Sequence, residues 1–204
     1  MDDVNGWTAM LAENPGHSRW YIERFRRMAD NEADLAGEAR LVDALVPRGA
    51  RILDAGAGTG RVGGHLAAAG HVVVGVDLDP ELVEEARALH PGPQWLVGDI
   101  ADLDSALADR AGAAEPFDAI VCAGNVMTFL ARSERRPALE GFARHLAADG
   151  RAAIGFGPDR GYPVDDFLSD AGAAGLAPDL LLGTWDLRAL RPSSDFLVAV
   201  LTHA

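Results

Sequence analysis

The feature that most constrains the fold is an alternation of short apolar runs with helix-like segments between residues 51 and 157. The apolar runs are RILDA, HVVVGVD, QWLVGD, FDAIVCA and RAAIGFG, and the segments between them are RVGGHLAAAG, PELVEEARALH, LDSALADRAG and ERRPALEGFARHLAADG. Continuous apolar strands that alternate with helices indicate a parallel sheet covered by helices on both faces. The sequence therefore predicts an α/β fold whose ligands bind at the carboxyl ends of the strands.

The two ends of the chain follow other patterns. A turn signal at residues 14–16 precedes a predicted helix that Ser18 can cap, and residues 34–46 have the apolar spacing of a second amphipathic helix. Near the C-terminus, APDLLLGTWDLRAL and DFLVAVLTH are strand-like stretches joined by residues 191–194, which predicts an antiparallel hairpin. A length of 204 residues favours one domain. We divide it into a helical cap over 1–47, a core over 48–157 and a C-terminal helix and hairpin over 158–204.

Charge and composition exclude several classes of function. The net charge is −13, so the overall field disfavours nucleic acid, and no apolar run approaches the roughly 20 residues of a membrane-spanning helix. The acidic start MDDVNGW lacks the basic region of a signal peptide, and the single Cys122 excludes an internal disulfide, so we expect a reduced, cytoplasmic protein. All 18 basic residues are Arg. Without Lys, a Schiff base, a P-loop and the Tyr-xxx-Lys pair of short-chain dehydrogenases are excluded.

The glycine-rich stretch ILDAGAGTGR at residues 52–61 follows a predicted strand and indicates a nucleotide-containing ligand. The dinucleotide fingerprint GxGxxG, counted from Gly56 and Gly58, requires a third glycine at position 61, where this chain has Arg61. Asp54 precedes the first glycine by two residues, and a carboxylate there would repel a pyrophosphate but would suit a cationic ligand. S-adenosylmethionine (SAM) carries an ammonium and a sulfonium and no phosphate, so the stretch favours SAM over a dinucleotide.

Four motifs carry a resemblance to a known family. In order, ILDAGAGTGR, VVVGVDLDPELVEEAR, LVGDI and FDAIVCAGNVMTFL resemble the class I SAM-dependent methyltransferases over at least residues 50–157. The resemblance implies a Rossmann-like sheet of seven strands, mostly parallel, with helices on both faces and an antiparallel C-terminal hairpin strand. It implies SAM as cofactor and S-adenosylhomocysteine (SAH) as product.

The resemblance also gives the residues that follow each strand an expected role in holding the cofactor. Asp77 would accept the ribose hydroxyl protons, and Leu78 would flank the adenine. Asp99 would accept from the adenine amino group, and Ile100 would contribute a backbone amide. The glycines would let the backbone approach the cofactor without a Cβ clash. The predicted cofactor-binding residues are Asp54, Gly56, Ala57, Gly58, Gly60, Arg61, Asp77, Leu78, Asp99, Ile100, Ala123 and Gly124.

Other charged residues near these motifs have structural interpretations. Asp79 precedes Pro80 and a helical segment, so it is predicted to cap that helix. In similar methyltransferases a Glu of a preceding helix lies close to the residue after the glycine loop, and Glu38 matches that Glu, so we expect it to pair with Arg61. The alternative is that the two are unrelated surface charges.

The residues that contact the methyl acceptor are expected on the N-terminal helix and on the later loops. His17, Tyr21 and Asn125 are the candidate catalytic residues, and the candidate substrate residues are Trp20, Asn125, Arg160, Tyr162, Trp185 and Arg188. Each has an alternative: Trp20 and Tyr21 as packing residues, His17 as an exposed helix-start residue, and the two Arg as partners of nearby acids.

The most favoured function is SAM-dependent methylation of an N or O atom of a small molecule. The His residues have no ligand-like spacing and the fourth strand ends in Ala123-Gly124 without an acid, so no metal site is expected. The same stretch lacks the N/D-P-P-Y/F motif of DNA amino-methyltransferases. Two alternatives remain, an NAD(P)-dependent oxidoreductase and a non-catalytic SAM-binding protein. A monomer or a homodimer is expected.

Overall fold

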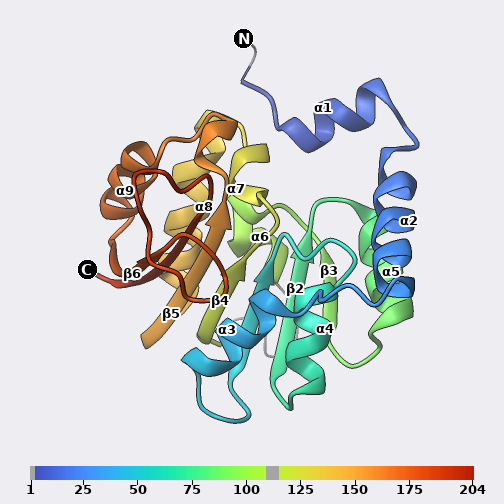
Figure 1. The fold of residues 1–204 in the computed structure, drawn as a ribbon, viewed down its shortest axis with the longest axis horizontal. Helices are drawn as coiled ribbons and strands as arrows, with labels where there is room; N and C mark the ends of the chain where they lie inside the picture. The colour runs from blue at the N-terminus through green and yellow to red at the C-terminus, as the bar shows by residue number, and fades with distance from the viewer. Residues whose placement is uncertain (1–2, 109–114) are drawn as a thin grey trace.

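The computed structural model describes residues 3–108 and 115–204. These residues form a seven-stranded sheet with the order β3-β2-β1-β4-β5-β7-β6 (Figure 1). Neighbouring strands from β3 to β5 are parallel, whereas β7 is antiparallel to both β5 and β6. The strands are β1 (Arg51–Ala55), β2 (Val72–Asp77), β3 (Gln94–Val97), β4 (Phe117–Cys122), β5 (Leu146–Phe156), β6 (Leu176–Leu182) and β7 (Leu197–His203). The predicted mostly parallel, Rossmann-like sheet with antiparallel C-terminal strands is confirmed.

Helices cover both faces of the sheet (Figure 1). Successive side chains of a strand point to opposite faces, so each strand contributes side chains to both helical layers. In β1, Ile52 packs on the side of α3 and α4, whereas Leu53 packs on the side of α6, α8 and α9 (Figure 1). On the first side, α5 also covers Trp95 of β3. The helices are α1 (Gly6–Glu13), α2 (His17–Asp30), α3 (Gly37–Leu45), α4 (Arg61–Ala68), α5 (Pro80–Leu89), α6 (Leu103–Leu107), α7 (Val126–Phe129), α8 (Arg132–His145) and α9 (Val164–Ala173), with short 3-10 turns at Ile100–Asp102 and Pro158–Arg160.

The N-terminal region differs from the prediction in two ways. The helix α1 was not predicted, and Asn5 caps it by accepting from the backbone N–H groups of Trp7 and Thr8. The predicted cap of α2 by Ser18 is wrong, because α2 already begins at His17 and the Ser18 hydroxyl donates to the Asp79 carboxylate instead. The prediction that Asp79 caps the next helix is confirmed, since Asp79 is the N-cap of α5.

The C-terminal strands pair as predicted, but their connection is longer than residues 191–194. β6 ends at Leu182 and β7 begins at Leu197. After Leu182 the chain turns back on itself, since the Gly183 N–H donates to the Arg188 carbonyl, and Trp185 lies against Gly155 of β5. Among the residues that the structure describes, no helix is both long enough and apolar enough to cross a membrane.

Candidate active site

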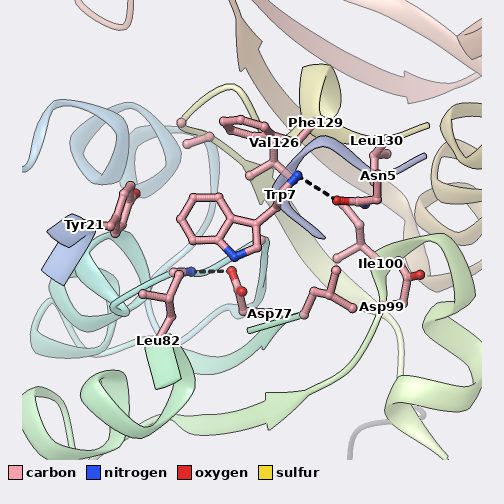
Figure 2. Close-up of a pocket in the computed structure, with 15 residues that line it drawn as sticks. Asn5, Trp7, Tyr21, Asp77, Leu82, Asp99, Ile100, Val126, Phe129 and Leu130 are labelled. Carbon is pink, nitrogen blue, oxygen red and sulfur yellow. Dashed lines mark hydrogen bonds between the residues drawn. The ribbon is translucent and has the colours of Figure 1, made fainter. Parts of the chain in front are cut away.

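A cavity of about 90 Å³ lies at the carboxyl ends of the parallel strands, beneath α1. Nine predicted cofactor or catalytic residues line it: Tyr21, Gly56, Gly58, Asp77, Leu78, Asp99, Ile100, Ala123 and Gly124. Figure 2 shows the acids and Tyr21 around the indole of Trp7. The sequence predictions therefore converge on one site, although they came from four separate strand ends.

The glycine loop after β1 turns tightly enough to bring its backbone to the cavity. Gly56 and Gly58 have φ values of +77° and +55°, which side chains rarely adopt. A Cβ at Gly56 would lie 2.5 Å from Val126 Cγ2, so the close approach of α7 also requires glycine there. The N–H groups of Gly56 and Ala57 both donate to the Val76 carbonyl, at 2.8 and 3.0 Å. These bonds hold the loop beside the end of β2.

Asp77, the last residue of β2, holds the same loop with its carboxylate. Its Oδ2 accepts from the Gly58 N–H at 2.7 Å (Figure 2), and its Oδ1 accepts from the Asp79 N–H at 2.9 Å. Burial raises the pKa of Asp77 to about 6, and the two N–H donors oppose that rise. An ionised carboxylate has about four acceptor positions, so two remain for a ligand after these two bonds.

Asp99 and Tyr21 border the cavity on other sides. Asp99 follows β3, and its Oδ1 accepts from the Ala101 N–H at 2.8 Å, which fixes the turn before α6. The hydroxyl of Tyr21, on α2, lies 3.6 Å from the position that a Cβ of Gly58 would take. Burial raises the pKa of Tyr21 to about 12. Tyr21 is therefore a hydrogen-bond donor near the glycine loop at neutral pH and is not a base.

Four other predicted residues of the glycine region, Asp54, Ala57, Gly60 and Arg61, do not line the cavity formed by the described residues. Ala57 lies in the loop and packs against Trp95 with α5. Gly60 is the left-handed N-cap of α4, and a Cβ there would meet Trp95 and Ala86 at 2.9 Å. Gly60 is therefore required for packing between α4 and α5, and not for the approach of the backbone to a ligand.

Arg61 forms the expected ion pair with Glu38. Its Nη1 and Nη2 donate to the two carboxylate oxygens at 2.8 and 2.6 Å, and the side chains are only 18% and 17% exposed. Arg61 also donates to the Leu35 carbonyl. The pair ties α3 to the start of α4, and its bidentate geometry confirms the prediction over the alternative of unrelated surface charges.

Asp54 is buried and takes a different position from the one expected. Its Oδ2 accepts from the Gly63 N–H at 2.7 Å, so it caps the first turn of α4, whose own N-cap Gly60 has no side chain. Burial raises the pKa of Asp54 to about 7. The carboxylate supports the loop from behind and, among the residues that the structure describes, is not part of the cavity wall.

Two of the three catalytic candidates lie outside the cavity wall in the described structure. The His17 ring stacks on Trp20 and meets the edge of Trp7, so it lies behind Trp7. Asn125 has a φ of +68°, and its Oδ1 accepts from the Gly157 N–H at 2.8 Å, which joins the ends of β4 and β5. Its side-chain oxygen is therefore engaged in holding the two strand ends together.

The substrate candidates on the later loops are also elsewhere. Arg160 is exposed beside Gly157, and Arg188 is exposed and pairs with Asp186 at 3.2 Å. Tyr162 is fully buried and its hydroxyl donates to Asp170 at 2.8 Å. Trp185 packs on β5 and Trp20 is 47% exposed on α2. In the described structure, residues 3–108 and 115–204, none of the substrate candidates lines the cavity, Asn125 included.

Six residues that line the cavity were not predicted: Asn5, Trp7, Leu82, Val126, Phe129 and Leu130. Trp7 makes edge-to-face contacts with Tyr21 and Phe129, with ring centroids 5.4 and 5.9 Å apart (Figure 2). The one sequence signal for this wall is Asn5, a preferred helix cap directly before GWTAMLAE. The contact between Trp7 and Phe129 joins segments about 120 residues apart, which local patterns do not reveal.

The residues of the cavity fit SAM. Two carboxylates can accept from ribose and adenine groups, Leu78, Leu82 and Ile100 offer apolar contact, and among the described lining residues there is no Arg to bind a phosphate. In the same residues, no group of three or more His, Cys, Asp or Glu is arranged to hold a metal ion. The sheet order, the glycine loop and the acids after β2 and β3 define the class I SAM-dependent methyltransferase fold and site.

Comparisons with known proteins agree with this class. A family model described as "Methyltransferase domain" matches residues 52–150. A TehB-like SAM-dependent methyltransferase from Corynebacterium glutamicum is 48% identical, with a TM-score of 0.86, over 94% of this chain and 100% of that one. The chain therefore belongs to the class I SAM-dependent methyltransferases, and its cofactor is SAM.

Two further matches are more limited. A ubiquinone biosynthesis O-methyltransferase from Xanthomonas axonopodis pv. citri is 42% identical over 82 residues, which are 38% of this chain. The chain thus spans about a third (32%) of the length of this curated relative. The SAM-bound amino pentose methyltransferase CalS10 from Micromonospora echinaspora is 19% identical with a TM-score of 0.67, over 89% of this chain and 95% of that one, and shows the fold alone.

Proposed function

We propose that this methyltransferase acts on an N or O atom of a small molecule. The observation that carries the proposal is the shape of the site, a cavity of about 90 Å³ roofed by α1. A segment of nucleic acid or protein would need an open groove, and the net charge of −13 repels a phosphate backbone. A small cavity with an apolar wall favours a small acceptor.

The cofactor half of the site is proposed to follow the order of the strands. Asp77 accepts from the ribose hydroxyl groups with its two spare acceptor positions, and Leu78 contacts the adenine. Asp99 and Ile100 bind the adenine amino group and ring. The backbone of the glycine loop, with Ala123 and Gly124, borders the methionine part, where the Tyr21 hydroxyl is placed to donate to the carboxylate.

The acceptor half is proposed to lie against Trp7, Val126, Phe129 and Leu130. SAM would supply a methyl group on its sulfonium, and the lone pair of the acceptor would attack that methyl carbon in line with the departing sulfur. The acceptor forms the new N–C or O–C bond, the S–C bond breaks to leave SAH, and the acceptor proton goes to solvent. In the acceptor half, the described wall has the polar side chain of Asn5 but no titratable side chain. The protein therefore contributes alignment and exclusion of water more than base catalysis.

The proposal includes both nitrogen and oxygen as the atom that is methylated. The partial curated relative is an O-methyltransferase. Among proteins that share the fold at 20% identity is the sugar N-methyltransferase KedS8. We also propose a cytoplasmic protein of one domain, which is a monomer or a homodimer.

Calorimetry followed by turnover tests this proposal. SAM and SAH should bind the purified chain, and NAD should not. SAH release is then measured with a panel of amine, phenol and carboxylate acceptors, with each acceptor omitted as the control. Turnover with an amine or a phenol would support the proposal, whereas SAM binding with turnover only on a nucleic acid or a protein would contradict it.

A further inference from the structure

The carboxylate of Asp79 connects both N-terminal helices to the body of the protein. Its Oδ2 accepts from the Trp7 indole Nε1 of α1 at 2.9 Å and from the Ser18 hydroxyl of α2. Its Oδ1 accepts from the Glu81 and Leu82 N–H groups at the start of α5. Asp79 is only 3% exposed. A single buried carboxylate therefore holds three helices at one point.

The helix α1 has few other attachments. None of residues 6–13, all of which the structure describes, is buried. Before the helix, the Asn5 Nδ2 donates to Glu134 at 3.0 Å, and the Asp3 carboxylate accepts from the N–H groups of Arg132 and Ser133 at the start of α8. A helix that buries so little apolar surface gains little stability from packing and opens at low cost. Its position therefore depends on these few polar contacts and on the ring contacts of Trp7.

The one α1 side chain that enters the cavity is Trp7. Its indole lies between Tyr21 and Asp77 in Figure 2, and Figure 1 shows α1 crossing above the strand ends between α2 and α7. Pockets that hold drug-sized ligands have about 300–1,000 Å³, whereas this cavity has about 90 Å³. A ligand of the size of SAM thus exceeds the space inside the cavity, and the wall element with no buried residue is α1.

The bonds of Asp79 also lead directly to the ribose acid. The Asp79 N–H donates to Asp77 Oδ1, and Asp77 Oδ2 accepts from the Gly58 N–H. A continuous chain of hydrogen bonds therefore runs from the glycine loop through Asp77 and Asp79 to the indole of Trp7. A ligand that binds Asp77 therefore contacts a residue that is hydrogen-bonded to Asp79, and Asp79 in turn holds Trp7.

We propose that Asp79 is a positioning residue that latches Trp7, and with it α1, over the cofactor cavity, so that opening this latch limits entry and exit of the cofactor. The proposal rests on the proposed function, because it assigns the cavity beneath α1 to the cofactor and acceptor. Asp79 does not line the described cavity. It acts through Trp7, which forms the wall that the bound molecules contact.

The test is a double-mutant cycle with Trp7→Phe and Asp79→Asn. Trp7→Phe keeps an aromatic ring in the wall but removes the Nε1 donor together with part of the ring, and the loss of ring volume is why a second Trp→Phe variant is needed as a control. Asp79→Asn keeps one side-chain oxygen to cap α5 and replaces the acceptor of the indole. Trp20→Phe is the matched control, because Trp20 is 47% exposed on α2 and does not line the described cavity.

Stopped-flow fluorescence measures association and dissociation of SAH for each variant. A hydrogen bond to a charged group is strong enough that we expect both rate constants to rise about tenfold in either single variant. The dissociation constant should change much less, because it is the ratio of the two rate constants and both rise by about the same factor. The double variant should be no faster than the single variants, since one bond cannot be broken twice. Amide hydrogen exchange in residues 6–13 should accelerate in parallel, and Trp20→Phe should match the wild type.

Three outcomes would overturn the proposal: unchanged SAH rate constants in both single variants, effects that add in the double variant, or a lower Tm for Asp79→Asn without faster α1 exchange. These outcomes are distinct from failure of the proposed function. If SAH does not bind the wild type, the cofactor assignment fails. If SAH binds and the variants exchange it like the wild type, only the latch fails.

Discussion

Replacing Asp77 with Ala gives the sharpest test of the cofactor half of the site. Two acceptor positions of the carboxylate are occupied by the N–H groups of Gly58 and Asp79, so two remain for the ribose hydroxyl groups. Hydrogen bonds to a charged group contribute about 1.5–3 kcal/mol each. Water replaces part of this loss, so we expect a net cost of about 2–3 kcal/mol, which is a dissociation constant for SAH about 30- to 150-fold higher.

The pH dependence of binding gives the same residue an independent signature. Burial raises the pKa of Asp77 to about 6, and the protonated acid accepts fewer hydrogen bonds from ribose. SAH affinity in the wild type should therefore be constant above about pH 7 and fall about tenfold for each pH unit below about 6. In Asp77→Ala the affinity should not vary with pH over this range.

Calorimetry from pH 5 to pH 8 measures both effects. Asp102→Ala is the matched control, because Asp102 is an exposed acid that caps α6 through the Ser105 N–H. Thermal melts establish that each variant is folded. A folded Asp77→Ala protein that binds SAH within about threefold of the wild type would refute the ribose assignment, since two charge-assisted bonds cannot be worth so little.

Three further substitutions test the surroundings of the cavity. Tyr21→Phe should weaken SAM binding several-fold and leave the pH profile of turnover between pH 6 and 9 unchanged, because the pKa of Tyr21 is about 12; calorimetry and initial rates measure this. Glu38→Gln should lower the free energy of unfolding by about 3 kcal/mol in urea titrations, because Arg61 is then a nearly buried charge without its partner. Asp54→Asn should flatten the pH dependence of stability. In the wild type the unfolded carboxyl ionises near pH 4 and the folded one near pH 7, so this contribution to stability falls as pH rises between those values and is lowest above 7.

The sheet and the cofactor half of the cavity could be predicted because their signals are local. A strand buried on both faces is mostly apolar, and β2 (VVVGVD) and β4 (FDAIVC) contain such apolar runs. The residue after such a strand lies at the ligand edge whatever the rest of the chain does. Asp77 and Asp99 follow from this rule, and both line the cavity.

The acceptor half was not predicted, because its wall depends on contacts between distant segments. The segment GWTAMLAE has no buried face, so it lacks the helical spacing that would reveal it. Trp7 meets Phe129, and Asn5 meets Glu134, only after the fold is formed. In the same way, the residues after Leu182 read as a strand in the sequence, but the chain turns back on itself, as the Gly183 N–H donates to the Arg188 carbonyl and Trp185 packs on β5.

Asp54 shows how a correct preference for SAM can rest on an incorrect position. The sequence reasoning placed its carboxylate beside the ligand, where it would repel a pyrophosphate. In the structure the carboxylate is 2% exposed and accepts from the Gly63 N–H of α4. In dinucleotide folds the free N–H groups of this helix start bind the pyrophosphate. Here the Asp54 carboxyl already accepts from one of these N–H groups, so the start of α4 offers a phosphate fewer donors than a free helix start would.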